Sequence, residues 1–219
     1  MQEQSKLSKI FIAIGAIIAT LAVLLQLYVI IENRVMSIAQ TLIKFFSYFT
    51  IISNIMVAIC FTTLSVKPTS KWGHFFSKAQ TVTAINVYIL VVGLVYNMVL
   101  RWLWSPKGLQ LVADNLLHVV VPIWFLIYWI AWIPKVNLQW KNVFYFLIYP
   151  AVYCVYILVR GAISNQYPYF FIDAAKLGYP QVALNCTVLL VVFLVLSLLH
   201  IGLAKLMHKK VSITSTAVL

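Results

Sequence analysis

Two polar side chains in separate apolar runs, Thr50 and His118, are the residues best suited to carry out chemistry. Thr50 follows Tyr48-Phe49 near the start of one run, and His118 lies near the start of another. An ionisable side chain in hydrocarbon is energetically costly, so we interpret His118 as functional. A threonine hydroxyl becomes a nucleophile when a base removes its proton, and a neutral imidazole is such a base near physiological pH. The two residues therefore suggest a nucleophile and its general base.

Three further polar residues are expected to support this pair. Asp114 precedes His118 by four residues, so both lie on one helix face. Its carboxylate would orient the ring or stabilise the imidazolium, as the third member of a catalytic triad does. The amides of Asn54 and Asn97, or a tyrosine hydroxyl, are candidate donors to a developing oxyanion.

The depth of these side chains along their helices places them in one layer of the membrane. Thr50 and His118 each lie five to seven residues into an apolar run, or roughly 8–10 Å at the helical rise per residue. Asn97 and Arg101 end a third run at the same side, and Arg160 ends a fifth. The two arginines are candidates to bind a substrate carboxylate through paired hydrogen bonds. Depth follows from the sequence, whereas lateral proximity does not.

Each residue also has a simpler explanation. A lone intramembrane threonine such as Thr50 commonly donates its hydroxyl to its own helix backbone. His118 can be a buried structural hydrogen-bonding group, and Asp114 a favourable anion in the first turn of a helix. Arg101 and Arg160 can extend toward lipid headgroups as interfacial anchors.

The composition identifies the class of protein. The chain has 219 residues, of which 63% are hydrophobic and 9% charged, whereas soluble domains carry about 25% charged residues. Such a chain is a polytopic membrane protein. The net charge of +12 is spread between apolar runs, so we attribute it to loops that face anionic lipid headgroups, and we expect no nucleic acid partner.

The apolar runs predict an all-α fold of six transmembrane helices in one bundle. The predicted spans are residues 10–31, 45–66, 80–100, 111–133, 143–159 and 181–203. They form a domain over 10–206, between a cytoplasmic N-terminus at 1–9 and a cytoplasmic tail at 207–219 that we expect to be disordered. The first run exceeds the length of a signal-peptide core, so it is expected to stay as a span. Pro122 is expected to bend the fourth span.

The distribution of basic residues predicts the orientation in the membrane. Ten of the 16 Lys and Arg residues lie on the side of the two termini and six on the other side. The positive-inside rule therefore places both termini in the cytoplasm, which for a bacterial protein means an inner-membrane location.

No cofactor or metal is expected. Cys60, Cys154 and Cys186 lie singly in apolar runs, which predicts buried free thiols and not a disulfide framework or a zinc site. The histidines other than His118 are too dispersed to bind a metal together. The chain also lacks the GxSxG, HExxH and glycine-rich phosphate-binding motifs.

The motif Tyr48-Phe49-Thr50, together with Leu117-His118 and Pro122, resembles the androgen-induced protein and androgen-dependent TFPI-regulating protein family. The chain looks most like bacterial six-span relatives of that family, which the segments 167–173 and 178–179 also resemble. The animal members are integral membrane threonine hydrolases that split fatty acid esters of hydroxy fatty acids. The resemblance implies Thr50 as nucleophile and His118 as base. It does not extend to Asp114, where the animal proteins carry a different residue, or to the arginines.

Three functions remain as hypotheses at this point. The first is a hydrolase that acts on a lipid ester with an acidic headgroup within the membrane. The second is a transporter or channel for protons or small anions, with His118 and the arginines lining the path. No inverted repeat is evident, and the ionisable groups crowd one leaflet, which disfavours transport. The third is a non-catalytic membrane scaffold.

Overall fold

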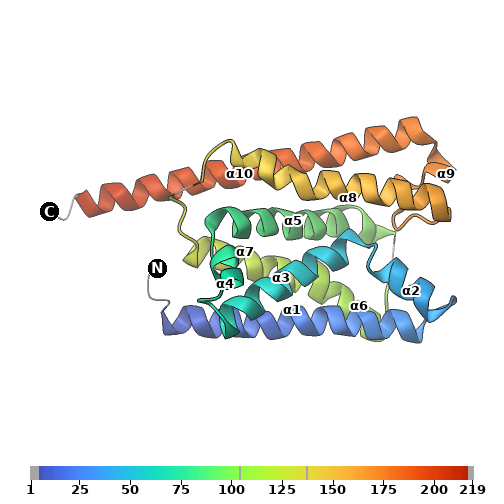
Figure 1. Ribbon diagram of the computed structural model, residues 1–219, viewed down its shortest axis with the longest axis horizontal. Helices are drawn as coiled ribbons and strands as arrows, with labels where there is room; N and C mark the ends of the chain where they lie inside the picture. The colour runs from blue at the N-terminus through green and yellow to red at the C-terminus, as the bar shows by residue number, and fades with distance from the viewer. Residues whose placement is uncertain (1–4, 104, 137, 217–219) are drawn as a thin grey trace. The chain divides into compact units, whose positions relative to one another are not determined.

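The computed structural model describes residues 5–103, 105–136 and 138–216, and within these ranges the chain forms helices and no strand (Figure 1). Six of the helical segments are long and apolar enough to cross a membrane. They are Lys6–Glu32, Phe49–Val66, Ala79–Trp102, Gly108–Trp132, Asn142–Ser164 and Tyr179–His208. The predicted all-α, six-span fold class is therefore confirmed.

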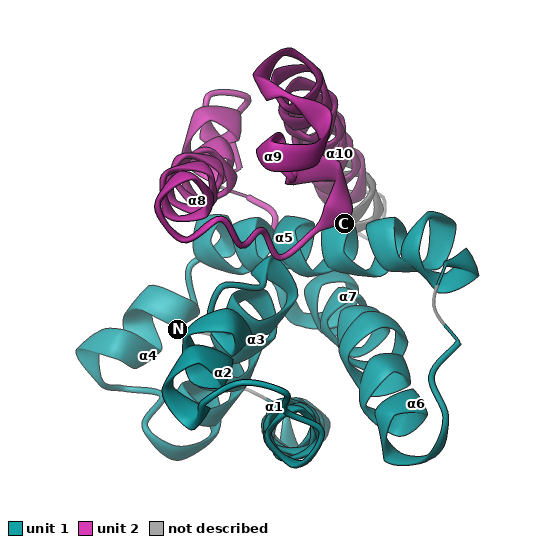
Figure 2. Cartoon of the chain, turned by 90° about the vertical axis from the view of Figure 1, so that its right-hand side faces the viewer, with its two compact units in different colours: residues 1–133 teal, residues 134–219 magenta. Residues whose placement is uncertain are grey.

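The chain forms two compact units, Met1–Ile133 and Pro134–Leu219, which are coloured separately in Figure 2. The first unit contains four of the six spans and the second contains two. The prediction that all six spans form one bundle stays a prediction, and each unit is described by itself below.

The first unit is built around α5 (Ala79–Met98), which is buried along most of its length. It packs against α3 (Phe49–Val66) and α7 (Val121–Trp132), and α1 (Lys6–Glu32) packs against both of these helices. Aromatic side chains fill the space between α3 and α7, where the rings of Phe61 and Phe125 lie 5.0 Å apart. The indole N–H of Trp129 donates to Thr83 Oγ1 (2.8 Å), which joins α7 to α5.

Two short helices occupy links that the sequence predicts as loops. In α2 (Ile38–Phe45), Ser37 and Gln40 form a reciprocal capping box, so the segment before Phe45 is a separate helix. The second is α4 (Lys71–Phe76), which Ser70 caps. Because α2 ends at Phe45, the following span begins at Phe49 and not at residue 45, which places Thr50 in its first turn.

The second unit is a pair of long helices, α8 (Asn142–Ser164) and α10 (Tyr179–Thr216), which run side by side (Figures 1 and 2). The connection between them contains η3 (Phe170–Ile172) and α9 (Ala174–Leu177). Ile172 and Ala174 pack with Ile157, Val182 and Cys186 in one apolar cluster. The aromatic connection therefore covers one end of this helix pair.

Both helices of the second unit are longer than the sequence predicts. The first runs to Ser164, so Arg160 lies inside it and not at its end. The second continues to Thr216, past the predicted end of its span at residue 203, and the disordered tail stays a prediction. No Gly or Pro follows Gly202 to stop the helix. Residues 217–219 lie outside the described residues.

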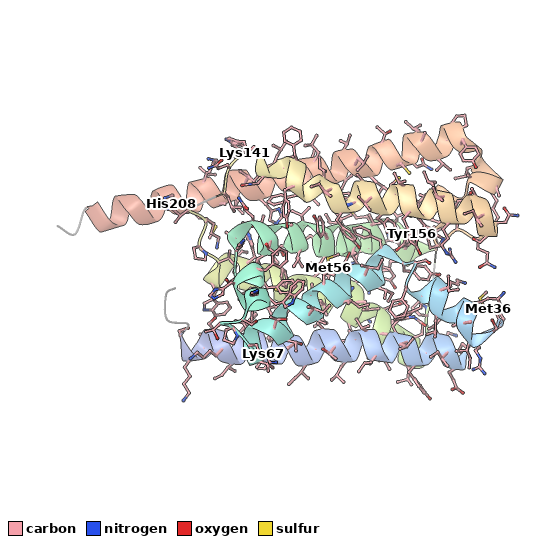
Figure 3. All side chains as sticks on the ribbon, viewed as in Figure 1. Met36, Met56, Lys67, Lys141, Tyr156 and His208 are labelled. Atoms are coloured by element: carbon pink, nitrogen blue, oxygen red, sulfur yellow. The ribbon has the colours of Figure 1, made fainter. Side chains whose placement is uncertain are left out.

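Labelled side chains in Figure 3 mark the ends of each unit. In the first unit, Lys67 after α3 and Met36 before α2 lie at opposite ends. In the second, Lys141 and His208 lie toward the same end. Lys205 Nζ also lies 5.7 Å from the centre of the Trp140 ring there. The side of the membrane that each end faces stays a prediction.

The three cysteines are free thiols, as predicted. Cys60 and Cys186 are buried, whereas Cys154 is half-buried.

Candidate functional site

The fourth span is interrupted by a turn of π-helix directly before Pro122. Between α6 (Gly108–Asn115) and α7, residues Leu116–Val120 form the π-helix η2. The Val121 N–H donates to Leu116 O, one residue further back than in an α-helix. Pro122 has no N–H, so the carbonyls of Leu117 and His118 lose their α-helical donors. The predicted bend at Pro122 thus takes the form of a widened turn.

Two asparagines from neighbouring helices donate to these two carbonyls. Asn54 Nδ2 in α3 donates to Leu117 O (3.3 Å), and Asn97 Nδ2 in α5 donates to His118 O (3.1 Å). The same nitrogens donate to Thr50 O and Gly93 O within their own helices, each at 2.8 Å. An amide –NH₂ has two donors. In each asparagine both donors bind backbone carbonyls, so an oxyanion could accept a hydrogen bond only by displacing one of these carbonyls.

Gly93 allows α5 to approach the π turn closely. A Cβ atom at this position would lie 3.1 Å from His118 O and 3.4 Å from the Pro122 Cβ. The distance to the carbonyl oxygen is tighter than ordinary van der Waals contact, and the distance to Pro122 is at its lower limit. A glycine at this position of α5 therefore brings Asn97, one turn later, within reach of the π turn.

The imidazole of His118 is buried and held in one orientation. Its Nδ1 lies 2.9 Å from the backbone carbonyl oxygen of Asp114, and its ring stacks on Tyr96 with centroids 3.8 Å apart and planes inclined by 12°. A carbonyl only accepts hydrogen bonds, so Nδ1 carries the proton of the neutral ring. Nε2, for which the described part of the chain supplies no hydrogen bond, then presents a lone pair.

The carboxylate of Asp114 binds groups other than the imidazole. Tyr96 Oη donates to Asp114 Oδ2 (3.2 Å), and Gln110 Nε2 donates to Asp114 Oδ1 (2.9 Å). Gln110 Nε2 also donates to Gln26 Oε1 of α1 (3.0 Å). Asp114 is 6% exposed, and these donors compensate the loss of water around a buried carboxylate. Asp114 therefore orients His118 through its backbone carbonyl, and the role of its carboxylate in stabilising an imidazolium stays a prediction.

Thr50 is half-buried in the first turn of α3. The single nitrogen Asn54 Nδ2 bridges the Thr50 carbonyl to the Leu117 carbonyl, beside His118. The described hydrogen bonds of His118 do not include one to the Thr50 hydroxyl. The segments that carry the predicted nucleophile and base are thus joined, without a direct bond between the two side chains.

The two arginines occupy different surroundings. Arg101, exposed in the 3₁₀ turn η1 (Leu100–Trp102), donates from Nη1 to Asn97 Oδ1 (2.9 Å). Asn97 thereby connects this guanidinium to the His118 backbone. Arg160 belongs to the second unit, where its Nη1 donates to Gln166 O (3.0 Å). The structure joins Asn54, Asn97, Arg101, Asp114 and His118 in one network of the first unit.

Tyr96, Gln110 and Gln26 are members of this network that the sequence reasoning missed. Gln110 precedes Asp114 by four residues, the spacing that had indicated Asp114 itself. Gln26 is an amide within an apolar run, which is an intramembrane polar signal of the same kind as His118. Tyr96 gives no comparable signal, because tyrosines are common at membrane interfaces.

Comparisons with known proteins give limited information. No family model matches the chain, and no solved structure matches it. An uncharacterized MG452 homolog of Mycoplasma pneumoniae is 32% identical over 131 residues, which cover 54% of this chain and 50% of that protein. The chain thus spans about half the length of the curated relative that it matches, and that relative's description names no activity.

Proposed function

We propose that this protein is an integral membrane hydrolase of lipid esters, of the fatty acid ester of hydroxy fatty acid type. Thr50 Oγ1 attacks the ester carbonyl carbon while His118 Nε2 takes the hydroxyl proton. The alcohol leaves with that proton, which forms a new ester between the acyl group and Thr50. His118 then deprotonates a water molecule that hydrolyses this ester and restores both residues.

The observation that carries the proposal is the 2.9 Å contact between His118 Nδ1 and the Asp114 carbonyl oxygen. A general base must present a lone pair, and the contact of Nδ1 with the Asp114 carbonyl leaves that lone pair on Nε2. In catalytic triads the same requirement is met by an acceptor at the opposite ring nitrogen. The stacked Tyr96 ring reduces the orientations open to the imidazole.

The link between Thr50 and the π turn supports the choice of nucleophile. Asn54 holds the first turn of α3 against Leu117, one residue from His118. The family resemblance also implies Thr50 and His118. Substrate binding then has to bring the hydroxyl and Nε2 within proton-transfer distance, as catalytic hydrogen bonds often shorten only in the substrate complex.

The proposal extends to the substrate and to the location of the protein. A free carboxylate on a hydrophobic ester would bind Arg101, whose guanidinium keeps further donors besides the one used by Asn97. The protein would lie in the plasma membrane if it is bacterial, with both termini cytoplasmic. Catalysis of this kind needs no cofactor.

A proton or anion transporter is the second candidate. It is favoured by the polar chain from Gln26 through Gln110 and Asp114 to Tyr96, which joins three helices in the apolar interior. Liposome flux that depends on Asp114 and His118 but not on Thr50 would support transport over hydrolysis.

The test of the hydrolase uses purified protein and a fluorogenic fatty acid ester. We expect Thr50→Ala to lower kcat by about 10³-fold or more and His118→Asn by about 10²–10⁴-fold. Thr50→Ser should keep measurable activity, because it keeps the hydroxyl. His118→Asn keeps a donor for the Asp114 carbonyl but lacks the Nε2 base, so it separates catalysis from folding.

The controls are matched residues elsewhere in the chain. Thr62→Ala changes an exposed threonine of the same helix. His200→Asn changes a buried histidine of the second unit, whose Nδ1 lies 2.7 Å from Leu196 O. Both should hydrolyse the ester like the wild type. Full activity in Thr50→Ala, or equal losses in the two histidine variants, would refute the mechanism.

A further inference from the structure

Three residues of the first unit, one of which is the candidate base His118, each contact the other two. Asp114 O accepts from His118 Nδ1, Asp114 Oδ2 accepts from Tyr96 Oη, and the Tyr96 ring stacks on the imidazole. All three side chains are less than 9% exposed. Each residue is therefore held by the other two, across α5 and the junction of α6 with η2.

The backbone carbonyl and the carboxylate of Asp114 have different roles in these contacts. Its backbone carbonyl selects the ring nitrogen that carries the proton, whereas its carboxylate holds the Tyr96 hydroxyl. The hydrogen bond restrains one edge of the imidazole, and a ring stacked 3.8 Å away restricts the remaining rotation of the side chain about χ1 and χ2. Gln110 holds the second carboxylate oxygen, and Gln26 of α1 holds Gln110 in turn.

We infer that Tyr96 is the positioning residue of His118, and that the Asp114 carboxylate holds the Tyr96 hydroxyl in place. This inference deepens the proposed function and rests on it where catalysis is concerned. One part of the inference does not depend on hydrolysis. Tyr96 keeps His118 in the Nδ1–H tautomer, which leaves the lone pair on Nε2.

The charged and titratable neighbours of His118 are few. Asp114 comes from the same span, and α5 contributes Tyr96 and, through Asn97, Arg101. Gln26 of α1 and Asn54 of α3 are neutral. Replacing the Tyr96 hydroxyl therefore changes hydrogen bonding without removing a charge.

The inference predicts different effects for two substitutions of Tyr96. Tyr96→Phe keeps the stacked ring and loses only the hydrogen bond to Asp114, so kcat should fall by about tenfold. Tyr96→Leu loses the ring as well, so kcat should fall by about 100-fold. KM should stay near the wild-type value in both variants, because a positioning residue does not contact the substrate. Asp114→Asn keeps an acceptor for the tyrosine, so its kcat should stay closer to the wild-type value than that of Tyr96→Phe.

A second measurement on the full chain does not depend on activity. Nitrogen NMR of protein labelled at histidine distinguishes Nδ1–H from Nε2–H rings, and His118→Asn identifies the His118 signals among those of four histidines. The wild type and Tyr96→Phe should show the Nδ1–H tautomer. Tyr96→Leu should show signals averaged between the two tautomers. Signals of His200 serve as an internal reference that should not move.

The control and the outcomes separate the two proposals. Tyr88→Leu removes another buried tyrosine of α5, two turns earlier, and should leave the His118 signals unchanged. A fixed Nδ1–H tautomer in Tyr96→Leu would overturn the positioning role, whatever the hydrolysis assay gives. A wild-type protein that hydrolyses no ester would overturn the proposed function, and the NMR result would still decide the role of Tyr96.

Discussion

At the residue scale, the polar side chains of the first unit divide into two groups with different tasks. Asn54 and Asn97 satisfy backbone carbonyls that Pro122 deprives of donors. Asp114, Tyr96 and His118 instead hold one another and leave an imidazole nitrogen available. A buried polar residue in a membrane helix is thus as often required by the backbone as by chemistry, and only its partners tell the two apart.

The structural task of the asparagines predicts a loss of stability. Asn54→Leu or Asn97→Leu leaves a carbonyl unsatisfied in an apolar interior, so each should lower the free energy of unfolding by about 1–3 kcal/mol. Unfolding in detergent micelles measures this change. Asn115→Leu is the matched control, because Asn115 is half-buried and its amide donates within its own helix, to Leu111 O. If Asn54→Leu were as stable as Asn115→Leu, the carbonyls would not need these donors.

At the scale of elements, the π turn decides which way His118 faces. The segment 116–120 contains one residue more per turn than an α-helix would, so α6 is rotated relative to α7. This rotation brings His118 onto Tyr96, and the close approach at Gly93 brings its carbonyl to Asn97. Interruptions of this kind are frequent at functional sites of membrane helices, where neighbouring helices satisfy the freed groups.

Pro122→Ala tests the role of the π turn. Alanine supplies the missing N–H to His118 O and favours a regular helix, so thermal stability in detergent should stay equal or increase. A regular α-helix would rotate residues before the turn by about 100°. Ester hydrolysis should therefore fall by about 100-fold.

Pro150→Ala is the control for this substitution, because Pro150 lies inside α8 of the second unit. It should leave hydrolysis unchanged. Wild-type hydrolysis by a stable Pro122→Ala protein would mean that the site does not depend on the π turn.

At the scale of the whole molecule, the candidate site belongs to one of the two units. Every contact described around His118 comes from residues of the first unit, and Arg160 lies in the second. Within the first unit the polar network gathers at one end of the spans, at the C-terminal part of α1 and α5 and the N-terminal part of α3 and α6. The charge distribution predicts that this end faces away from the cytoplasm.

The orientation can be tested on a full chain in which the three native cysteines are replaced. Lys107→Cys and Lys71→Cys place exposed thiols in links between spans that are predicted to lie on opposite sides. A membrane-impermeant maleimide should label Lys107→Cys in intact cells and Lys71→Cys only after lysis. The reverse pattern would place the termini outside.

The sequence alone determined the class, the six spans and the common depth of the polar residues, because hydrophobic length and the helical rise depend on local residues only. It predicted that Asn97 and His118 lie in one layer, and the hydrogen bond from Asn97 to the His118 carbonyl agrees. The short helices α2 and α4 were missed because polar loops and short capped helices have similar composition.

Only the tertiary structure decided which groups meet across helices. The rotation of one helix against another depends on the π turn and on the packing at Gly93, neither of which the hydrophobic pattern encodes. For this reason Tyr96, an ordinary interfacial residue in the sequence, proves to be the residue on which His118 stacks, and Asn54 and Asn97 prove to be partners of the backbone. Depth in the membrane is a local property of the chain, whereas lateral contact is a property of the packed unit.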